Sequence, residues 1–203
     1  MRIRKRRTDV RSRRSRGQSL VEFALVIPIF ITLVVAIAEF AFLFATFLSA
    51  SFTSRDAVQV AAEMGGNPCS DHVILQRIEG DITGPADKTK ITGVDIFWSD
   101  SAGNVKAGAV NTWVRGGSSS CTLPSTTVIT VPYHQTSNSY PLADRCNVIS
   151  AADCASGHTT IDTIGVKITY QYTWITPLPG LIGGSGTGMQ IVQSNMMRLE
   201  PVK

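Results

Sequence analysis

The sequence predicts an α+β fold, in which a long N-terminal helix with a membrane-spanning lower half is followed by a small exported domain with an antiparallel β-sheet. Three observations predict it. Residues 20–52 are almost entirely apolar, segments with strand-like alternation follow, and all four cysteines lie beyond the apolar run. We expect a basic cytoplasmic leader at residues 1–17, a helix at residues 18–64 that is transmembrane at about residues 20–42, and an extracytoplasmic domain at residues 65–203.

The positive charge of the chain is concentrated in the leader. Residues 1–16 hold nine Arg and Lys and one acid, a net charge of +8, and the whole chain carries +4, so residues 17–203 sum to −4. A polybasic run can bind nucleic acid, but one that directly precedes an apolar run is typical of the cytoplasmic flank of a membrane helix. We therefore expect the lipid bilayer as a partner and no nucleic acid. The expected location is the inner (cytoplasmic) membrane, crossed once, with the N-terminus in the cytoplasm.

The apolar run is long enough to cross a bilayer, which needs about 20 residues. Ala36-Ile37-Ala38 has the small-x-small form of a signal-peptidase site, but the residues after it stay apolar, which favours an uncut anchor. Helical spacing continues until Gly65, Gly66, Asn67 and Pro68 end the pattern. Such a helix would be about 70 Å long, roughly twice the thickness of a bilayer core.

The upper half of this helix projects beyond the membrane and needs a surface to pack on. Phe44, Phe47, Phe52 and Val58 form an apolar stripe at spacings close to the helical period. A stripe of this kind left in water makes an adhesive patch. We expect it to bury against the exported sheet or against neighbouring subunits.

The exported part is expected to contain one short helix and several strands. The clearest strand is at residues 164–175, where large apolar side chains alternate with small or polar ones and predict one buried face. The other expected elements are a helix at residues 70–80 with Ser70 as its N-cap, strands at 92–98, 110–115 and 126–133, a closing strand at 189–199, and loops at 116–120 and 134–160.

The cysteines predict two disulfides. Cys69, Cys121, Cys146 and Cys154 form an even set in an exported domain, which allows three connectivities. Cys146 and Cys154 enclose seven residues and are the first-choice pair, leaving Cys69 with Cys121. A metal site is not expected, since no C-x-x-C or H-x-x-x-H spacing is present.

Catalytic motifs are absent from the sequence. There is no G-x-S-x-G and no H-E-x-x-H, and the glycine-rich residues 183–188 lack the G-K-[ST] of a phosphate loop. His72, His134 and His158 stand among polar neighbours, where surface positions are expected, and the acids of residues 71–100 are expected to be solvated. We therefore expect neither enzyme activity nor a cofactor.

Where leader and helix meet, the chain reads Gly17-Gln18-Ser19-Leu20-Val21-Glu22-Phe23. A basic leader, a glycine, four residues, a glutamate, an aromatic residue and an apolar helix together resemble the type IV prepilin processing site. The resemblance implies that a prepilin peptidase cuts between Gly17 and Gln18, and that Glu22 and Phe23 belong to a docking surface between subunits. After such a cut Gln18 would carry a new α-amino group one helical turn from Glu22.

Further segments resemble the TadE-like pseudopilins of Tad (Flp) pilus systems. They are RGQSLVEFALVIPIF, the acid Glu39 after the span, SRDAVQVAA at residues 54–62, and a closing VKITYQY…MMRLEP. Residues 16–62 carry most of the resemblance. The leader is unusually rich in arginine, Phe23 stands where the major Flp pilins carry tyrosine, and TadG-like proteins share the N-terminal pattern.

The resemblance implies a minor pilin or pseudopilin that acts by packing and docking, with other pilins and the pilus assembly platform as partners. An alternative of a different class is a membrane-tethered extracytoplasmic binding domain that does not enter a filament. In the plainest alternative, a simple anchor, Glu22 would sit in the headgroup layer and favour the helix N-terminus through the macrodipole.

Overall fold

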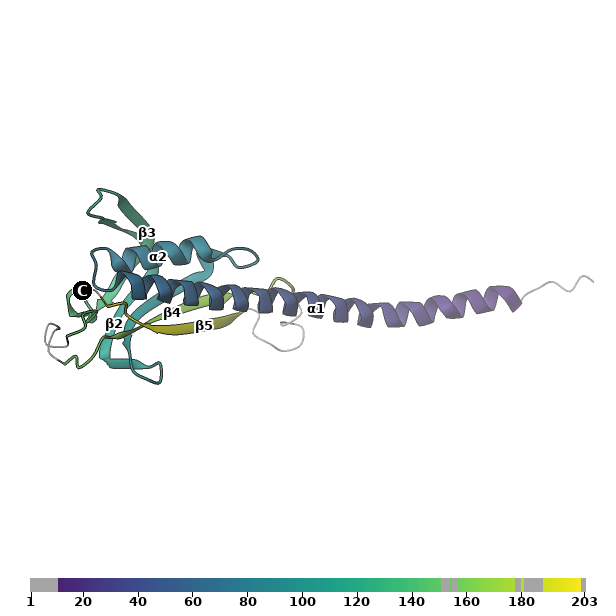
Figure 1. Ribbon diagram of the computed structural model, residues 1–203. Helices are drawn as coiled ribbons and strands as arrows, with labels where there is room; N and C mark the ends of the chain where they lie inside the picture. The colour runs from purple at the N-terminus through teal and green to yellow at the C-terminus, as the bar shows by residue number, and fades with distance from the viewer. Residues whose placement is uncertain (1–10, 151–153, 155–156, 178–179, 181–187, 202–203) are drawn as a thin grey trace, which may run out of the picture.

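A computed structural model describes residues 11–150, 154, 157–177, 180 and 188–201, with side chains of the first helix from Gly17 onward. Figure 1 shows one long helix, α1 (Arg11–Met64), whose C-terminal half carries a small domain and whose N-terminal half stands clear of it. The predicted α+β class is confirmed. The helix begins at Arg11 instead of Gln18, because the arginine-rich residues before the apolar run favour helix and no strong breaker separates the two.

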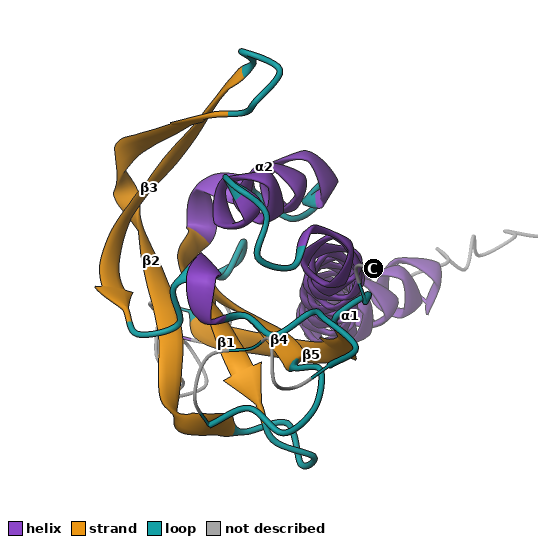
Figure 2. Cartoon of the chain, turned by 60° about the vertical axis from the view of Figure 1, so that its left-hand side comes forward, coloured by secondary structure: helices purple, strands orange, loops and turns teal. Residues whose placement is uncertain are grey.

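The domain is built on one five-stranded antiparallel sheet with the order β3-β2-β1-β4-β5. Both long helices lie on the same face of this sheet, as Figure 2 shows. The elements after α1 are α2 (Ser70–Asp81), η1 (Lys88–Lys90), β1 (Ile91–Ser99), β2 (Val105–Thr122), β3 (Val128–Asn138), η2 (Leu142–Asp144), β4 (Thr163–Tyr172) and β5 (Met189–Arg198). Each strand and the helix expected from the sequence is present, and residues 110–115 pair with β1 as expected.

One expected loop is entirely strand, and a second is partly strand. Residues 116–120 lie inside β2, and residues 134–138 lie inside β3. A register shift between Arg115 and Ser119 absorbs the glycines as a bulge, with Gly116 at φ 106°, and pairing then resumes at Ser119 opposite Val131. Cross-strand pairing therefore outweighs the weak strand propensity of Gly and Ser here. Beyond the bulge, β2 and β3 form an arm that stands out from the sheet (Figures 1 and 2).

The start of α2 also differs from expectation. Its N-cap is Cys69, in the left-handed region with φ 64°, and Ser70 is already helical. Cys69 takes this position with its sulfur bonded to Cys121 on the arm. The second disulfide joins Cys146 to Cys154, so the connectivity is the one expected from the sequence. No described cysteine is free.

The core fills the space between the sheet and the two helices. On β4 the predicted alternation holds, since Ile164, Val166, Ile168, Tyr170 and Tyr172 are all buried. The strand ends at Tyr172, three residues earlier than expected. Other large contributors are Ile74, Leu75 and Ile78 on α2, Val94 and Ile96 on β1, and Val131 and Tyr133 on β3.

Small and polar residues of α1 form its contact with the sheet. The buried stripe of the helix begins at Glu39 and continues through Thr46, Ala50, Ser54, Ala57, Val58 and Ala61. Ser54 Oγ donates a hydrogen bond of 3.1 Å to the carbonyl oxygen of Val166, and the Asn195 side chain donates one of 3.1 Å to Ser54 Oγ. Residues of this size let the helix backbone approach the strands closely, which bulky side chains would prevent.

Candidate functional site

The predicted processing segment lies on the free part of α1. Gly17, Gln18, Glu22 and Phe23 are exposed, and Gln18 Nε2 donates a hydrogen bond of 3.1 Å to Glu22 Oε1. The spacing of four therefore brings Gln18 and Glu22 onto one helix face, as residues one turn apart require. Phe23 leaves 61 % of its surface exposed, so in the single chain it packs on nothing that would bury it.

The peptide bond between Gly17 and Gln18 lies inside the helix. A helical bond has its backbone groups engaged in the i to i−4 ladder, so a peptidase that binds an extended strand must first unwind this turn. Glycine lowers the cost of doing so, because a helical glycine is about 1 kcal/mol less stable than alanine. Apart from its chain neighbours and the backbone of its own helix, no described atom lies within 4 Å of the position that a Cβ would take on Gly17.

The four cysteines do not join this segment, since they lie in the domain. One disulfide ties the start of α2 to the β2–β3 arm, and the other ties Cys146, after η2, to Cys154. They cross-link segments of the domain.

Where the free helix meets the domain, Glu39 is buried. Its carboxylate accepts hydrogen bonds from the Tyr172 hydroxyl at 2.8 Å and from the backbone N–H groups of Ile175 at 3.0 Å and Thr176 at 2.8 Å. These contacts turn the chain away from the sheet after Tyr172, which explains why β4 ends there. The sequence marked Glu39 only as an acid after the span. A carboxylate inside an apolar run needs hydrogen-bond partners. This need was the one feature of the sequence that could have indicated that Glu39 contacts the domain.

The junction at Glu39 divides α1 into two parts. By length and composition α1 is a candidate membrane span, and none of its most apolar window is buried by the domain. Residues 20–38 have no buried member, whereas Glu39 begins the part packed on the domain. Nineteen helical residues rise about 28 Å, close to the roughly 30 Å of a bilayer core. The expected span of about residues 20–42 thus overlaps the packed part at residues 39–42.

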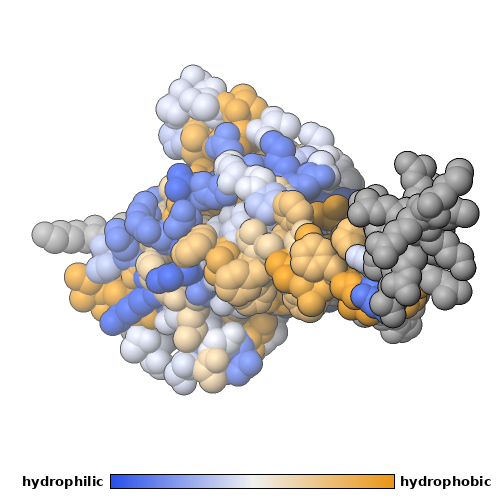
Figure 3. Space-filling model, turned by 90° about the vertical axis from the view of Figure 1, so that its right-hand side faces the viewer, coloured by the Kyte–Doolittle hydropathy of each residue, from blue (hydrophilic) through white to orange (hydrophobic). Residues whose placement is uncertain are grey.

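Above the junction, α1 exposes a row of large apolar side chains. This phenylalanine face consists of Phe40, Phe44, Phe47, Leu48 and Phe52, which are 72 %, 61 %, 42 %, 37 % and 59 % exposed. Figure 3 shows hydrophobic surface gathered in a band along the projecting helix. Of the two surfaces expected to bury the stripe, the sheet buries Val58, which is 2 % exposed, and does not bury the three phenylalanines. The reason is that the small side chains occupy the contact with the sheet. For these phenylalanines, burial against neighbouring subunits stays a prediction.

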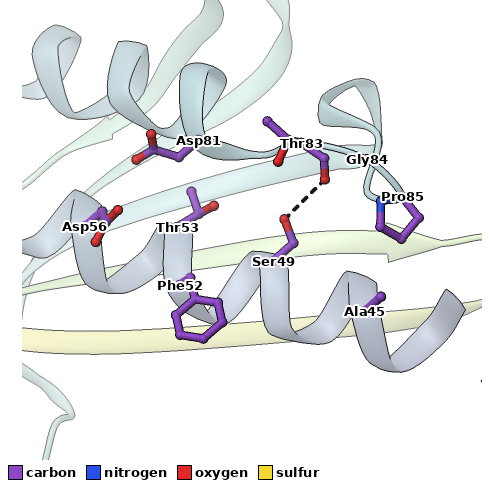
Figure 4. A pocket seen from close by; sticks show the side chains of 9 residues that line it. All are labelled: Ala45, Ser49, Phe52, Thr53, Asp56, Asp81, Thr83, Gly84 and Pro85. Carbon is purple, nitrogen blue, oxygen red and sulfur yellow. Dashed lines mark hydrogen bonds between the residues drawn. The ribbon is translucent and has the colours of Figure 1, made fainter. Parts of the chain in front are cut away.

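A groove runs between this face and the loop after α2. Figure 4 shows Asp56 and Asp81 at one end and Ala45 and Pro85 at the other, with Phe52 on its rim. The groove encloses about 280 Å³, below the range of roughly 300–1,000 Å³ that is common for small-molecule sites. Its acids are engaged, since Arg77 pairs with Asp56 at 3.5 Å and with Asp81 at 2.6 Å.

A buried polar network joins α2 to the sheet and to the segment around η2. The Arg145 guanidinium pairs with Oδ1 of Asp71. Oδ2 of Asp71 accepts a hydrogen bond of 2.9 Å from Asn111 Nδ2. Asp71 is 6 % exposed, so the expectation that the acids near residue 71 are solvated is wrong for it. A buried charge needs such partners, and these come from segments far apart in the chain.

A second part of the network surrounds Asp162. Asp162 accepts a hydrogen bond of 2.8 Å from the Tyr140 hydroxyl and lies 2.6 Å from His158 Nδ1. Burial, and then the negative charge of Asp162, raise the pKa of Tyr140 far above its usual range.

The histidines are less exposed than expected, with one exception. The His158 side chain is 5 % exposed and stacks on Trp98, and His72 is half-buried beside Trp113, whereas His134 is exposed. Within the described residues, no group of three or more His, Cys, Asp or Glu side chains is placed to hold a metal ion.

Comparison with known families covers the helix. Residues 17–59 match the family model described as TadE-like protein. These 43 of the 203 residues are similar to TadE-like proteins. The TadE-like match contains the processing segment, Glu39 and the whole phenylalanine face, and it ends before the sheet begins. No curated protein and no solved structure matches the chain.

Proposed function

We propose that this chain is a minor pilin or pseudopilin of a Tad (Flp) pilus system, which acts by packing and docking and catalyses no reaction. In this proposal a prepilin peptidase removes the leader after Gly17. The mature chain sits in the inner membrane with its domain outside the cytoplasm. It then contacts other pilins and the pilus assembly platform. The TadE-like match supports the Tad context.

One observation carries the proposal: above Glu39 the two sides of α1 differ. Small residues of α1 are buried on the sheet, whereas the phenylalanine face of the same helix is exposed. Because Glu39 lies where the apolar span ends, Phe40 would lie at the membrane boundary and the rest of this face above the hydrocarbon core. Four phenylalanines and a leucine in one row form the kind of exposed patch that marks a protein-binding surface, and a helix with this pattern is suited to pack against another helix.

The same logic applies at the lower end of α1. Glu22 is exposed beside an apolar helix, and a carboxylate near the membrane core is costly unless it is paired. After cleavage, the new α-amino group of Gln18 is a partner within the chain, and the amine of a neighbouring subunit is a partner between chains. A pair held at low dielectric favours correctly docked subunits, since breaking it leaves an uncompensated charge. Glu22→Gln should therefore be cleaved and inserted normally, yet fail to support pilus assembly.

The phenylalanine face supplies a test with a matched control. Phe52 on α1 and Val128 on β3 are both 59 % exposed, so a glutamate at either position adds the same charge at similar exposure. Phe52→Glu should abolish or strongly reduce piliation while the protein still accumulates in the membrane. Val128→Glu should leave piliation intact. Normal piliation with Phe52→Glu would contradict the proposal and favour the alternative of a tethered binding domain that never enters a filament.

A further inference from the structure

The segment that follows β4 is held against α1 at residue Glu39 of the helix. Tyr172, Ile175 and Thr176 all donate hydrogen bonds to the Glu39 carboxylate. We call residues 173–177 the junction segment. It lies at the end of the domain from which the free half of α1 projects (Figure 1).

The position of Glu39 fixes the height of this segment relative to a membrane. This step rests on the proposed function, in which residues 20–38 span the bilayer. Nineteen residues of helix rise about 28 Å, so Glu39 would stand at the boundary between the hydrocarbon core and the headgroups. Hydrogen bonds of 2.8–3.0 Å to Glu39 then place the backbone of the junction segment at the same boundary.

The side chains here are those that favour a membrane boundary. Ile175 is 61 % exposed, Phe40, the residue after Glu39, is 72 % exposed, and Trp174 is half-buried with its ring edge-on to Tyr172. Tryptophan concentrates at membrane interfaces, where its ring meets apolar chains and its N–H meets polar headgroups. The Glu39 carboxylate is buried under three hydrogen bonds and does not face outward.

The composition of the chain around the junction segment also favours a position at the membrane boundary. Between Lys167 and Arg198 the sequence holds no Asp, Glu, Lys or Arg. An exported domain that kept this stretch in water would gain solubility from charges here. A surface in contact with lipid avoids them, because burying an ion without a partner is costly.

We propose that the junction segment is a second membrane contact, in which Trp174 and Ile175 enter the headgroup layer of the bilayer beside the emerging helix. The bilayer is the chosen occupant because the segment continues directly from the span. Glu39 acts as a positioning residue that holds the segment at this depth. Two contacts, the helix and the segment, would fix how the domain is oriented on the membrane before assembly.

Tryptophan fluorescence in vesicles tests the contact. The full chain is reconstituted at low protein-to-lipid ratio into phosphatidylcholine vesicles whose lipids carry bromine, a contact quencher, either near the headgroup or deep in the acyl chain. The variant Trp174→Phe supplies the background from Trp98 and Trp113. The difference between wild type and this variant should be strongly quenched by the shallow bromines and less by the deep ones. Equal quenching of wild type and Trp174→Phe by both lipids would overturn the proposal.

Two further variants separate this inference from the proposal beneath it. Phe30→Trp, made in the Trp174→Phe background, reports on the middle of the span and should be quenched most by the deep bromines. If it is quenched and Trp174 is not, the second contact is wrong and the span stands. If neither is quenched, the span itself is wrong. Ile175→Trp in the same background gives a second reading of the segment, independent of any effect that loss of Trp174 has on folding.

Discussion

Glu39 on α1 and Tyr172 at the end of β4 are joined by a hydrogen bond of 2.8 Å, although 133 residues separate them in the chain. With the backbone N–H groups of Ile175 and Thr176, the carboxylate accepts three hydrogen bonds in a buried position. This contact lies where the helix leaves the domain, between the unburied residues 20–38 and the part of α1 that packs on the sheet.

Loss of the Glu39 carboxylate should destabilise the domain. Glu39→Ala leaves two backbone N–H groups and a hydroxyl without their acceptor, which should lower the free energy of unfolding by about 1–3 kcal/mol. Urea unfolding of the full chain in detergent, followed by tryptophan emission, measures this. Glu63→Ala, on an exposed position of the same helix, is the control and should change it by less than about 0.5 kcal/mol. Equal effects from the two variants would contradict the role of Glu39.

Gly165 is expected to tolerate no side chain. It pairs with Phe97 across β1 and β4, and a Cβ at Gly165 would collide with the Phe97 ring. Gly165→Ala should therefore cost about 1–3 kcal/mol through overpacking. Gly93→Ala is the matched control, since a Cβ there would meet the Trp113 carbonyl oxygen at an ordinary 3.5 Å. Adding Phe97→Leu to Gly165→Ala should recover part of the loss; no recovery would show that the ring is not the obstacle.

The two disulfides should differ in their contribution to stability. Cys69 and Cys121 are separated by 52 positions, and Cys146 and Cys154 by 8. If cross-links act mainly on the entropy of the unfolded chain, replacing the first pair by alanine should cost about 4 kcal/mol and replacing the second about 2.5 kcal/mol. Thermal or urea unfolding of the two double variants gives the order. A larger loss from the short loop would reject the entropic account for this domain.

Acid should destabilise the domain through His72. Burial lowers the pKa of His72, an effect that the neighbouring Asp71 partly opposes. A base with a lowered folded pKa binds its proton more readily when unfolded, so the folded state loses stability as the pH falls below the unfolded value of about 6.5. Above that pH the contribution is constant. His72→Gln should flatten the difference in unfolding free energy between pH 7 and pH 5, whereas His134→Gln, at an exposed position, should not.

The parts of the fold that are encoded locally could be predicted from the sequence. Alternation on β4 and the Gly-Gly-Asn-Pro stop after α1 each act within a few residues, and the structure has both features where they were expected. The β2–β3 arm could not be predicted, because its Gly and Ser residues become strand only by pairing with β3. The exposure of the phenylalanine face could not be predicted either. The hydrophobic pattern does not show that small residues such as Ala57 pack on the sheet in place of the phenylalanines.

The partners of the buried charges could not be predicted from the sequence either. Asp71 and Arg145 lie 74 positions apart, and neither has a local signature that marks the other as its partner. The predicted processing segment could be proposed from the sequence because its parts are consecutive, from the basic leader through Gly17 to Glu22, and its cleavage stays a prediction. Glu39 was visible as an unusual acid, but its partners after β4 required the fold.

The mature N-terminus tests the account of this chain most directly. Protein purified from the membrane of the cells that make it should give an intact mass that begins at Gln18, and the mass should revert to the uncut chain when the cognate prepilin peptidase is deleted. A matched variant, Gly17→Leu, should also remain uncut. A mass that still includes the arginine-rich leader in wild-type cells, with the peptidase present, would contradict the pilin-type account.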